Sequence, residues 1–458
     1  MSATYFRNAR VVTEDADFLG GVVVAGGVVT EVVEGTPDRP GDVVEVGGRV
    51  LLSGLVDPHV HFSEPGRDWE GWLTGSRSAA AGGITSVAEM PLNAIPPTTD
   101  VSALRLKLES ARTSVVDYTL WGGVVPGNEH EIGPLAREGV TGFKAFMCRG
   151  SDEFPHVSID DLHIGARRIR QAGSFLAVHA EDEALTSRLT RTLIADGRRD
   201  PKAWGEARPV EAEVRAIASA IALAAGVGCR LHIVHVSTAE GIDLVTAARE
   251  ARQDVTNETC PHYLFFTEDD LHTVGPFAKC APPLRSAEIR EELWARVLSG
   301  DVDIIASDHS PCPLADKEAG TDDIFKAWGG ISGIQSGLNA ILTEGVHRRG
   351  LPLSAVARMM SANPARLLGQ YPRKGTIAPG SDADLVIVDL DKAFTLKASD
   401  LAYRHPHSAY AGQTFRGTVD ATFLRGKMIH GEGLGAAPVG GGRFLNAVAD
   451  VPATALTD

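Results

Sequence analysis

Histidines, one lysine and one aspartate recur in this sequence where short β-branched runs end. Imidazole nitrogens and carboxylate oxygens are ligands that divalent transition metals readily accept. In the sequence His59-Val60-His61, side chains alternate along a strand, so the two imidazoles point to the same side and can share one ion. The candidate metal ligands are His59, His61, Lys144, His179, His235 and Asp308.

Lys144 is the unusual member of this set, because a protonated ammonium has no lone pair and repels a cation. If burial and nearby positive charge keep the amine neutral, it can add carbon dioxide and become a carbamate (N6-carboxylysine) whose two oxygens bridge two metals. The alternative is a buried lysine in an ion pair. His179 and His235 also have an alternative as core histidines, and Asp308 as a cap or turn residue. The coincidence of all six positions favours a site with two metal ions.

The elements that must position these residues form a repeated strand–helix pattern, which is typical of a parallel sheet. Eight such strands predict a (β/α)₈ barrel over residues 54–371, and reactive groups in this fold lie at the carboxyl ends of the strands. The expected strands are Leu55–His59, Ile84–Glu89, Tyr118–Gly122, Gly142–Phe146, Phe175–His179, Leu231–His235, Val255–Thr259 and Asp303–Ser307.

Both ends of the chain instead resemble short antiparallel strands separated by Gly, Pro and Asp turns. We therefore expect residues 1–53 and 372–458 to form one small composite β-sandwich domain. The Gly-rich tail from Gly431 onward is expected to be a loosely held extension.

The strand–helix pattern indicates an α/β protein, and the composition is of ordinary globular type. The 458 residues are 43% hydrophobic and 22% charged, and 44 basic against 59 acidic side chains give a net charge of −15. Such a charge argues against nucleic acid or anionic membranes as partners. The apolar stretch Ala216–Cys229 is too short to cross a bilayer and predicts a buried helix. The sequence has no secretory signal pattern, and its five widely spaced cysteines favour reduced thiols in the cytoplasm.

Four motifs give the sequence a resemblance to a known family. They are Gly54-Leu-Val-Asp-Pro-His-Val-His61, Gly142-Phe-Lys-Ala-Phe146, Cys260-Pro-His-Tyr-Leu264 and Ser307-Asp-His-Ser310. With these motifs the chain resembles the cyclic amidohydrolases, which comprise dihydroorotases, hydantoinases and allantoinases, within the metal-dependent amidohydrolase superfamily. The resemblance implies hydrolysis of a cyclic amide, a carboxylated Lys144 that bridges two metals, commonly zinc, and a homotetramer. The ligand types would also accept Co, Mn, Ni or Fe.

The resemblance also bears on the substrate. Dihydroorotases place an arginine two residues after the second metal histidine, where this sequence has Ser63, so a small neutral cyclic ureide is favoured. Segments such as Met90–Thr98 and Ala327–Gly333 are most similar to the allantoinase branch, whose reaction opens allantoin to allantoate in purine breakdown. The substrate-binding candidates are Ser63, Arg67, Asn93, Ala281 and Gly329.

Asp308 is expected to act both as metal ligand and as the catalytic base that takes a proton from water and delivers it to the departing nitrogen. Three alternatives stay open. The first two are other cyclic amidohydrolase activities, that of a hydantoinase or dihydropyrimidinase and that of a dihydroorotase. The third is a non-catalytic assembly protein, because some relatives of this fold have lost metal ligands and taken that role.

Overall fold

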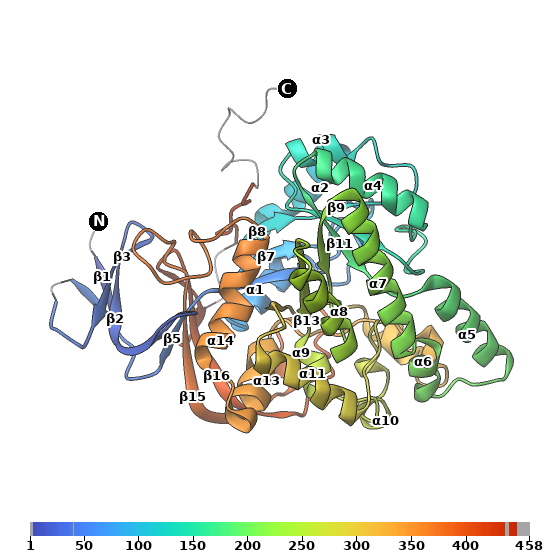
Figure 1. The fold of residues 1–458 in the computed structure, drawn as a ribbon. Helices are drawn as coiled ribbons and strands as arrows, with labels where there is room; N and C mark the ends of the chain where they lie inside the picture. Colours follow the sequence, from blue (N-terminus) through green and yellow to red (C-terminus); the bar gives the residue numbers. More distant parts are fainter. Residues whose placement is uncertain (1–2, 40, 436–438, 447–458) are drawn as a thin grey trace.

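The larger part of the molecule is a barrel of parallel strands. The computed structural model describes residues 3–39, 41–435 and 439–446 (Figure 1). Two parallel sheets, with strand orders β6-β7-β8 and β9-β10-β11-β12-β13-β14, make up the barrel. β8 and β9 are consecutive pieces of one strand interrupted at Trp121, so the barrel has eight strand positions. The strands are β6 (Leu55–Val60), β7 (Ile84–Glu89), β8 (Asp117–Leu120), β9 (Gly122–Gly123), β10 (Phe143–Phe146), β11 (Phe175–His179), β12 (Arg230–Ile233), β13 (Val255–Thr259) and β14 (Ile304–Ile305).

The barrel closes between its first and last strands. Val60 pairs in parallel with His309, and the backbone N–H of His61 donates to the carbonyl of His309 over 2.8 Å. Each of the eight predicted strands overlaps one of the observed positions. The predicted (β/α)₈ barrel is confirmed.

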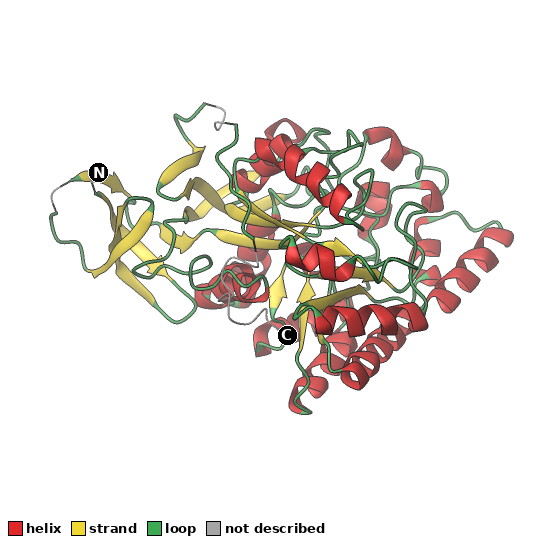
Figure 2. Ribbon diagram, turned by 90° about the horizontal axis from the view of Figure 1, so that it is seen from above, coloured by secondary structure: helices red, strands yellow, loops and turns green. Residues whose placement is uncertain are grey.

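Helices surround the barrel on its outside, as the red ribbons around the yellow strands show in Figure 2. The longer helices are α1 (Trp72–Ala81), α2 (Val101–Ser110), α4 (Ile159–Gln171), α5 (Glu183–Ala195), α7 (Val210–Val227), α8 (Ala239–Glu250) and α11 (Ala287–Ser299). The shorter ones are α3 (Ile132–Arg137), α6 (Pro201–Ala207), α9 (Pro261–Phe265), α10 (Asp270–Thr273), α12 (Leu314–Glu318), α13 (Gly337–Ile341), α14 (Leu353–Ala357) and α15 (Asn363–Leu367).

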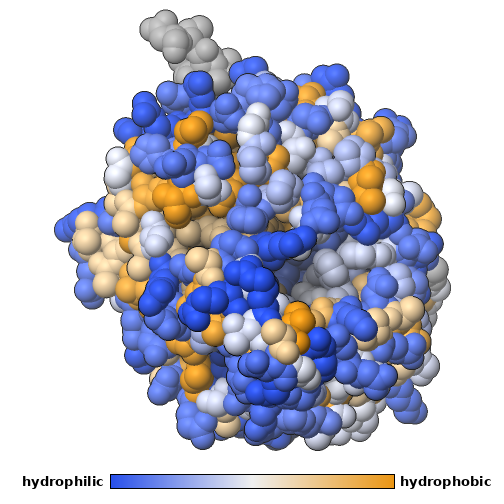
Figure 3. Space-filling view, turned by 90° about the vertical axis from the view of Figure 1, so that its right-hand side faces the viewer, coloured by the Kyte–Doolittle hydropathy of each residue, from blue (hydrophilic) through white to orange (hydrophobic). Residues whose placement is uncertain are grey.

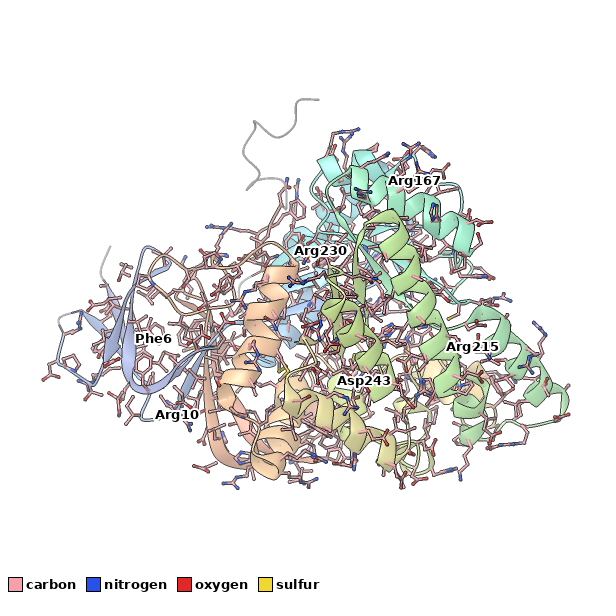
Figure 4. All side chains as sticks on the ribbon, in the orientation of Figure 1. Phe6, Arg10, Arg167, Arg215, Arg230 and Asp243 are labelled. Carbon is pink, nitrogen blue, oxygen red and sulfur yellow. The ribbon has the colours of Figure 1, made fainter. Side chains whose placement is uncertain are left out.

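α7 shows how the local sequence sets a helix. Pro209 precedes its first turn, where Glu211 and Glu213 complement the helix dipole, and Gly228 ends it in the left-handed region at φ 71°. Its alanines were expected to be buried, but only one side of the helix faces the core. The opposite side is exposed and carries Arg215 (Figure 4). Small alanine side chains suit both environments, which is why the apolar run did not reveal the exposed side.

The two chain ends share one sheet at the left of Figure 1. Its strand order is β17-β16-β15-β5-β1-β2-β3, with β4 paired to β1, so the C-terminal strands continue without a break into the N-terminal strands. The junction is antiparallel, with Val386 of β15 opposite Leu52 of β5. The strands are β1 (Thr4–Val12), β2 (Asp17–Ala25), β3 (Val28–Glu34), β4 (Asp42–Glu45), β5 (Val50–Ser53), β15 (Leu385–Thr395), β16 (Thr414–Leu424) and β17 (Lys427–Gly431).

Aromatic packing joins the two halves of this terminal domain. Phe6 of β1, labelled in Figure 4, is fully buried and meets Phe423 of β16 edge to face, with ring centroids 4.9 Å apart. The composite β domain built from both termini is therefore confirmed. We propose residues 53/54 and 371/372 as the boundaries between this domain and the barrel.

Part of the C-terminal tail is bound to the barrel. The N–H of Tyr118 donates to the carbonyl of Arg443 (2.9 Å), and the N–H of Leu445 donates back to the carbonyl of Tyr118 (2.7 Å). Residues 443–445 thus continue beside β8, contrary to the loosely held extension that was expected for the tail. The expectation for residues 436–438 and 447–458 lies outside the described residues. Among the described residues, no helix combines the length and the apolar character needed to span a bilayer.

Candidate metal centre

The predicted metal ligands all lie at the carboxyl ends of barrel strands. His59 is in β6 with His61 just beyond it, Lys144 is in β10, and His179 ends β11. His235 and Asp308 follow β12 and β14. All six residues are at most 7% exposed. The structure therefore places all six candidate ligands, buried, at one end of the barrel.

His59, His61 and Asp308 form the first group. The Nε2 atoms of both histidines lie 3.2 Å from Oδ1 of Asp308. Two ring nitrogens and a carboxylate oxygen that converge in this way, all within 4.8 Å of one another, match the donor set of a divalent metal.

His179 and His235 form the second group. Nδ1 of His179 lies 3.0 Å from Nε2 of His235. The His59 and His235 rings, with centroids 5.4 Å apart, bring the two groups side by side. Burial lowers the pKa of His59, His179 and His235, which favours the neutral imidazole with a lone pair.

Backbone strain accompanies two of the candidate ligands. His235 has a φ of 41° and Asp308 a φ of 43°, a region that non-glycine residues rarely adopt. Strain of this kind persists where the surrounding structure holds a side chain in a required direction, and it concentrates at functional sites. Here it aims both side chains at the same end of the barrel.

Lys144 lies fully buried, and its Nζ has no hydrogen-bond acceptor within the part of the chain that the structure describes. A buried ammonium is normally paired, so this orphaned atom is an exception that needs a cause. Burial lowers its pKa to about 8, which increases the share of neutral amine at physiological pH. A neutral amine can react with carbon dioxide, so the residues present fit two divalent ions with a bridging group at Lys144.

Buried carboxylates fix the orientation of the histidines by hydrogen bonding to their rings. Glu258 accepts hydrogen bonds from Nδ1 of His59, from Nε2 of His232 (3.1 Å) and from the backbone N–H of His235 (3.2 Å). Burial would raise the pKa of Glu258, but His59 and His232 hold it below its usual value. Because Nδ1 of His59 is occupied by Glu258, its Nε2 lone pair is left for a metal.

Glu181 orients His179 in the same way that Glu258 orients His59. Nε2 of His179 lies 2.7 Å from Oε2 of Glu181. The Arg208 guanidinium forms an ion pair with that carboxylate. Burial would raise the pKa of Glu181, but Arg208 and His179 lower it to about 2. The Nδ1 lone pair of His179 is thereby directed toward His235.

Asp308 is ionised at neutral pH. Burial would raise its pKa, but His59 and His61 beside the carboxylate lower it to about 2. An ionised carboxylate can bind a cation and can also accept a proton from a polarised water.

A cavity of about 250 Å³ lies over these ligands. Figure 3 views the molecule from the side of α5 and α6, where the surface is hollowed near the middle of the face. Five predicted ligands line the cavity, and Lys144 is the one that does not. The other lining residues are Leu92, Asn93, Phe146, Arg149, Gly150, Ser151, Trp204, Arg208, Ala281, Ser310, Ala327, Trp328 and Gly329.

Comparison with known proteins identifies the family. The amidohydrolase family model matches residues 50–429. The chain belongs to the amidohydrolase family. It is 49% identical to an allantoinase of Rubrobacter xylanophilus, over 89% of this chain and 90% of that one, and 38% identical to an allantoinase of Escherichia coli K12, over 95% and 97%. Among solved structures, the L-hydantoinase (dihydropyrimidinase) of Arthrobacter aurescens matches with a TM-score of 0.94 and 36% identity, covering 97% of this chain and all of that one.

The substrate-binding candidates of this amidohydrolase fall into two groups. Asn93, Ala281 and Gly329 line the cavity, and Oδ1 of Asn93 is buried without a partner among the described residues. Ser63 and Arg67 are not among the lining residues. Ser63 is fully buried, and its backbone N–H donates to Glu89 (3.1 Å).

Arg67 is held away from the cavity by its own contacts. Its guanidinium lies over the ring of Trp69, 4.4 Å from the centroid, and its Nη2 donates to Glu153 (2.9 Å). The residue type could be read from the sequence, but the direction of the side chain could not. In its place, the amidohydrolase cavity is lined by Arg149 and Arg208, which were not predicted.

The orienting carboxylates were also missed. Glu181 stands two residues after His179, the same spacing that identified His59 and His61, so a signal was present. Glu258 lies in β13, a strand that ends in no predicted ligand, and only its inward position in the alternating strand indicates a role.

Another acidic group in this amidohydrolase is already neutralised by cations. Asp117, Asp382 and Asp384 lie close together, but Nζ of Lys374 reaches all three at 2.5–2.8 Å and Arg425 also pairs with Asp117. This cluster joins the start of β8 to the terminal domain and acts as a structural ion-pair network.

Proposed function

We propose that this amidohydrolase hydrolyses the ring amide bond of allantoin to give allantoate, a step of purine breakdown. The observation that carries the proposal is the convergence of His59, His61, Lys144, His179, His235 and Asp308 beneath one cavity. Relatives that are 38–49% identical over most of the chain are allantoinases, which supports the choice of ring.

His59, His61 and Asp308 would hold one divalent ion, and His179 and His235 the other. A carbamate on Lys144, formed with carbon dioxide, would bridge them. The orphaned, buried Nζ supports this modification, because a carbamate would provide the partners that the amine lacks. When bound, the ions would supply the Lewis acidity that brings the pKa of water toward neutrality and polarises a carbonyl.

Asp308 carries the proton in the proposed reaction. Its carboxylate accepts a proton as water attacks the ring carbonyl carbon. It then returns that proton to the ring nitrogen as the C–N bond breaks. Its ionised state at neutral pH and its position against the cavity support both steps.

The walls of the cavity suit a neutral ring. Ala281 and Gly329 would present backbone groups to the ring, and the free Oδ1 of Asn93 would accept from an N–H of the ureido arm. The two lining arginines already have carboxylate partners, since Arg208 pairs with Glu181 and Arg149 contacts Asp152 at 3.1 Å. The buried Arg208 is therefore not left to neutralise a substrate carboxylate, which disfavours dihydroorotate.

Three further properties belong to the proposal. We propose zinc as the native metal, because four imidazoles with oxygen ligands suit it, although Co, Mn, Ni or Fe would also fit. A homotetramer is proposed from the family resemblance. A cytoplasmic location is proposed because all five cysteines are free and buried, as reduced thiols are in that compartment.

A substrate panel tests the proposed ring. Protein supplied with Zn²⁺ is assayed with allantoin, hydantoin, dihydrouracil and dihydroorotate, and kcat/KM is compared. Allantoin should be the best substrate by at least about tenfold. Negligible allantoin hydrolysis beside rapid turnover of hydantoin or dihydrouracil would favour the second candidate function, a hydantoinase or dihydropyrimidinase, which the 0.94 TM-score to the Arthrobacter aurescens enzyme supports.

A further inference from the structure

A buried guanidinium forms part of the wall of the cavity. Arg208 follows the last residue of α6, lines the cavity, and leaves 12% of its side chain exposed. One edge of its guanidinium forms the ion pair with Glu181. Its Nε is buried and has no hydrogen-bond partner among the described residues. A strong donor therefore remains unpaired in a residue that lines the cavity.

The position of this side chain is fixed on several sides. The guanidinium lies over the ring of Trp204, 4.6 Å from the centroid, and Nε1 of Trp204 donates to the carbonyl of Cys280 (2.7 Å). The carbonyl of Arg208 accepts from Nη1 of Arg285 over 2.6 Å. These contacts hold Arg208 in place before any ligand binds, which lowers the entropic cost of using it.

The chemistry of the missing partner can be stated. An N–H that is buried and unpaired is unfavourable, and a ligand that brings an acceptor relieves this. The acceptor should be neutral, because the charge of Arg208 is already balanced by Glu181. A carbonyl oxygen meets both conditions, whereas a second carboxylate would add an uncompensated charge to a buried site.

We propose that Arg208 is a specificity-determining residue whose Nε–H donates to the carbonyl oxygen of the ureido arm of the substrate. This inference rests on the proposed function, since the arm distinguishes allantoin from hydantoin, which has the same ring. Asn93, on the same cavity, offers an unpaired acceptor for an N–H of that arm. One unpaired donor and one unpaired acceptor complement a group that carries both a carbonyl and N–H groups.

The test compares two substrates in one variant. Arg208→Lys keeps a cation beside Glu181 but removes the Nε–H. The ratio of kcat/KM for allantoin to that for hydantoin should fall about 10- to 100-fold relative to the wild-type enzyme. Arg349→Lys is the matched control, because Arg349 also lies over a tryptophan, Trp294, and pairs with a carboxylate, Glu291, but lies outside the cavity lining. In the control the ratio should stay within about twofold.

A second measurement does not depend on the variant folding. The wild-type enzyme is given an allantoin analogue whose arm carries sulfur in place of the carbonyl oxygen. Sulfur is a weak acceptor, so kcat/KM should fall about tenfold or more.

Several results would overturn the inference. They are an unchanged substrate ratio in Arg208→Lys, an equal loss for both rings, or full activity on the sulfur analogue. An equal loss accompanied by reduced metal content would assign Arg208 a purely structural role through Glu181 and His179. Failure of the proposed function is a separate result, because it appears in the wild-type enzyme as absence of allantoin hydrolysis.

Discussion

Replacing Glu258 by glutamine is expected to weaken metal binding without unfolding the protein. The carboxylate accepts from Nδ1 of His59 and from Nε2 of His232 at the same time. A glutamine amide has one oxygen and one NH₂ group, so it cannot accept from both. One imidazole must then change its tautomer, and if this is His59, its Nε2 becomes protonated and loses the lone pair that is left for a metal.

The size of the effect follows from the contact that is lost. A hydrogen bond to an ionised group contributes about 1.5–3 kcal/mol, and loss of a carboxylate behind a metal-binding histidine costs about 10- to 100-fold in metal affinity. We expect the Kd for Zn²⁺ to rise by that factor in Glu258→Gln. The assay is a titration of metal-free protein with Zn²⁺ in the presence of a competing chelator. Enzyme activity is then measured as a function of the free Zn²⁺ concentration.

Glu213→Gln is the matched control for this measurement. Glu213 is as buried as Glu258, at 2% and 1% exposure, but it accepts from the backbone N–H and hydroxyl of Ser237 and bonds to none of the proposed ligands. Its variant should bind Zn²⁺ within about threefold of wild type. Zn²⁺ binding by Glu258→Gln within about twofold of wild type would refute the idea that this carboxylate orients His59.

Three further predictions concern buried charges. Lys144→Ala should lose at least about a thousandfold in kcat, with partial rescue by acetate or propionate standing in for the carbamate; full activity without rescue would contradict the bridging role. Lys317→Met should lower the free energy of unfolding, measured in urea, by about 3 kcal/mol. The reason is that Nζ of Lys317 donates to the carbonyls of Lys279 (3.1 Å) and Trp328 (2.9 Å). The control variant Lys326→Met, at an exposed lysine, should change this free energy by under about 0.5 kcal/mol. In metal-free protein, the stability that Glu181 contributes should be fully present above pH 4.5, where an ordinary glutamate titrates, and be lost as pH falls toward its folded pKa of about 2. The difference in unfolding free energy between wild type and Glu181→Gln should therefore be smaller at about pH 3 than at about pH 7; an equal difference at both values would contradict it.

Much of the fold could be predicted because strand-length hydrophobic runs recur in the sequence and several end in a polar residue. Hydrophobic runs of strand length recur between helical segments, and His179 and Asp308 mark the ends of two of them. In a barrel all such ends meet on one face, so the metal ligands could be placed together without knowing any distance. The pairing of both termini in one sheet followed from the similar turn-rich pattern at each end.

Side-chain direction and distant partners could not be predicted in the same way. Arg67 was predicted to bind the substrate, yet its side chain contacts Trp69 and Glu153 instead. Arg208 lies 27 residues from its partner Glu181, after a helix whose placement depends on tertiary packing. No periodicity links such a pair, so only the structure brings them together.

A crystal structure of active, metal-loaded protein with anomalous scattering would test the central claim most directly. We predict two metal peaks per chain. One should lie between His59, His61 and Asp308 and the other between His179 and His235, with carbamate density extending from Nζ of Lys144 between them. A single peak, or an unmodified Lys144 remote from both ions in crystals of active enzyme, would contradict the two-metal centre.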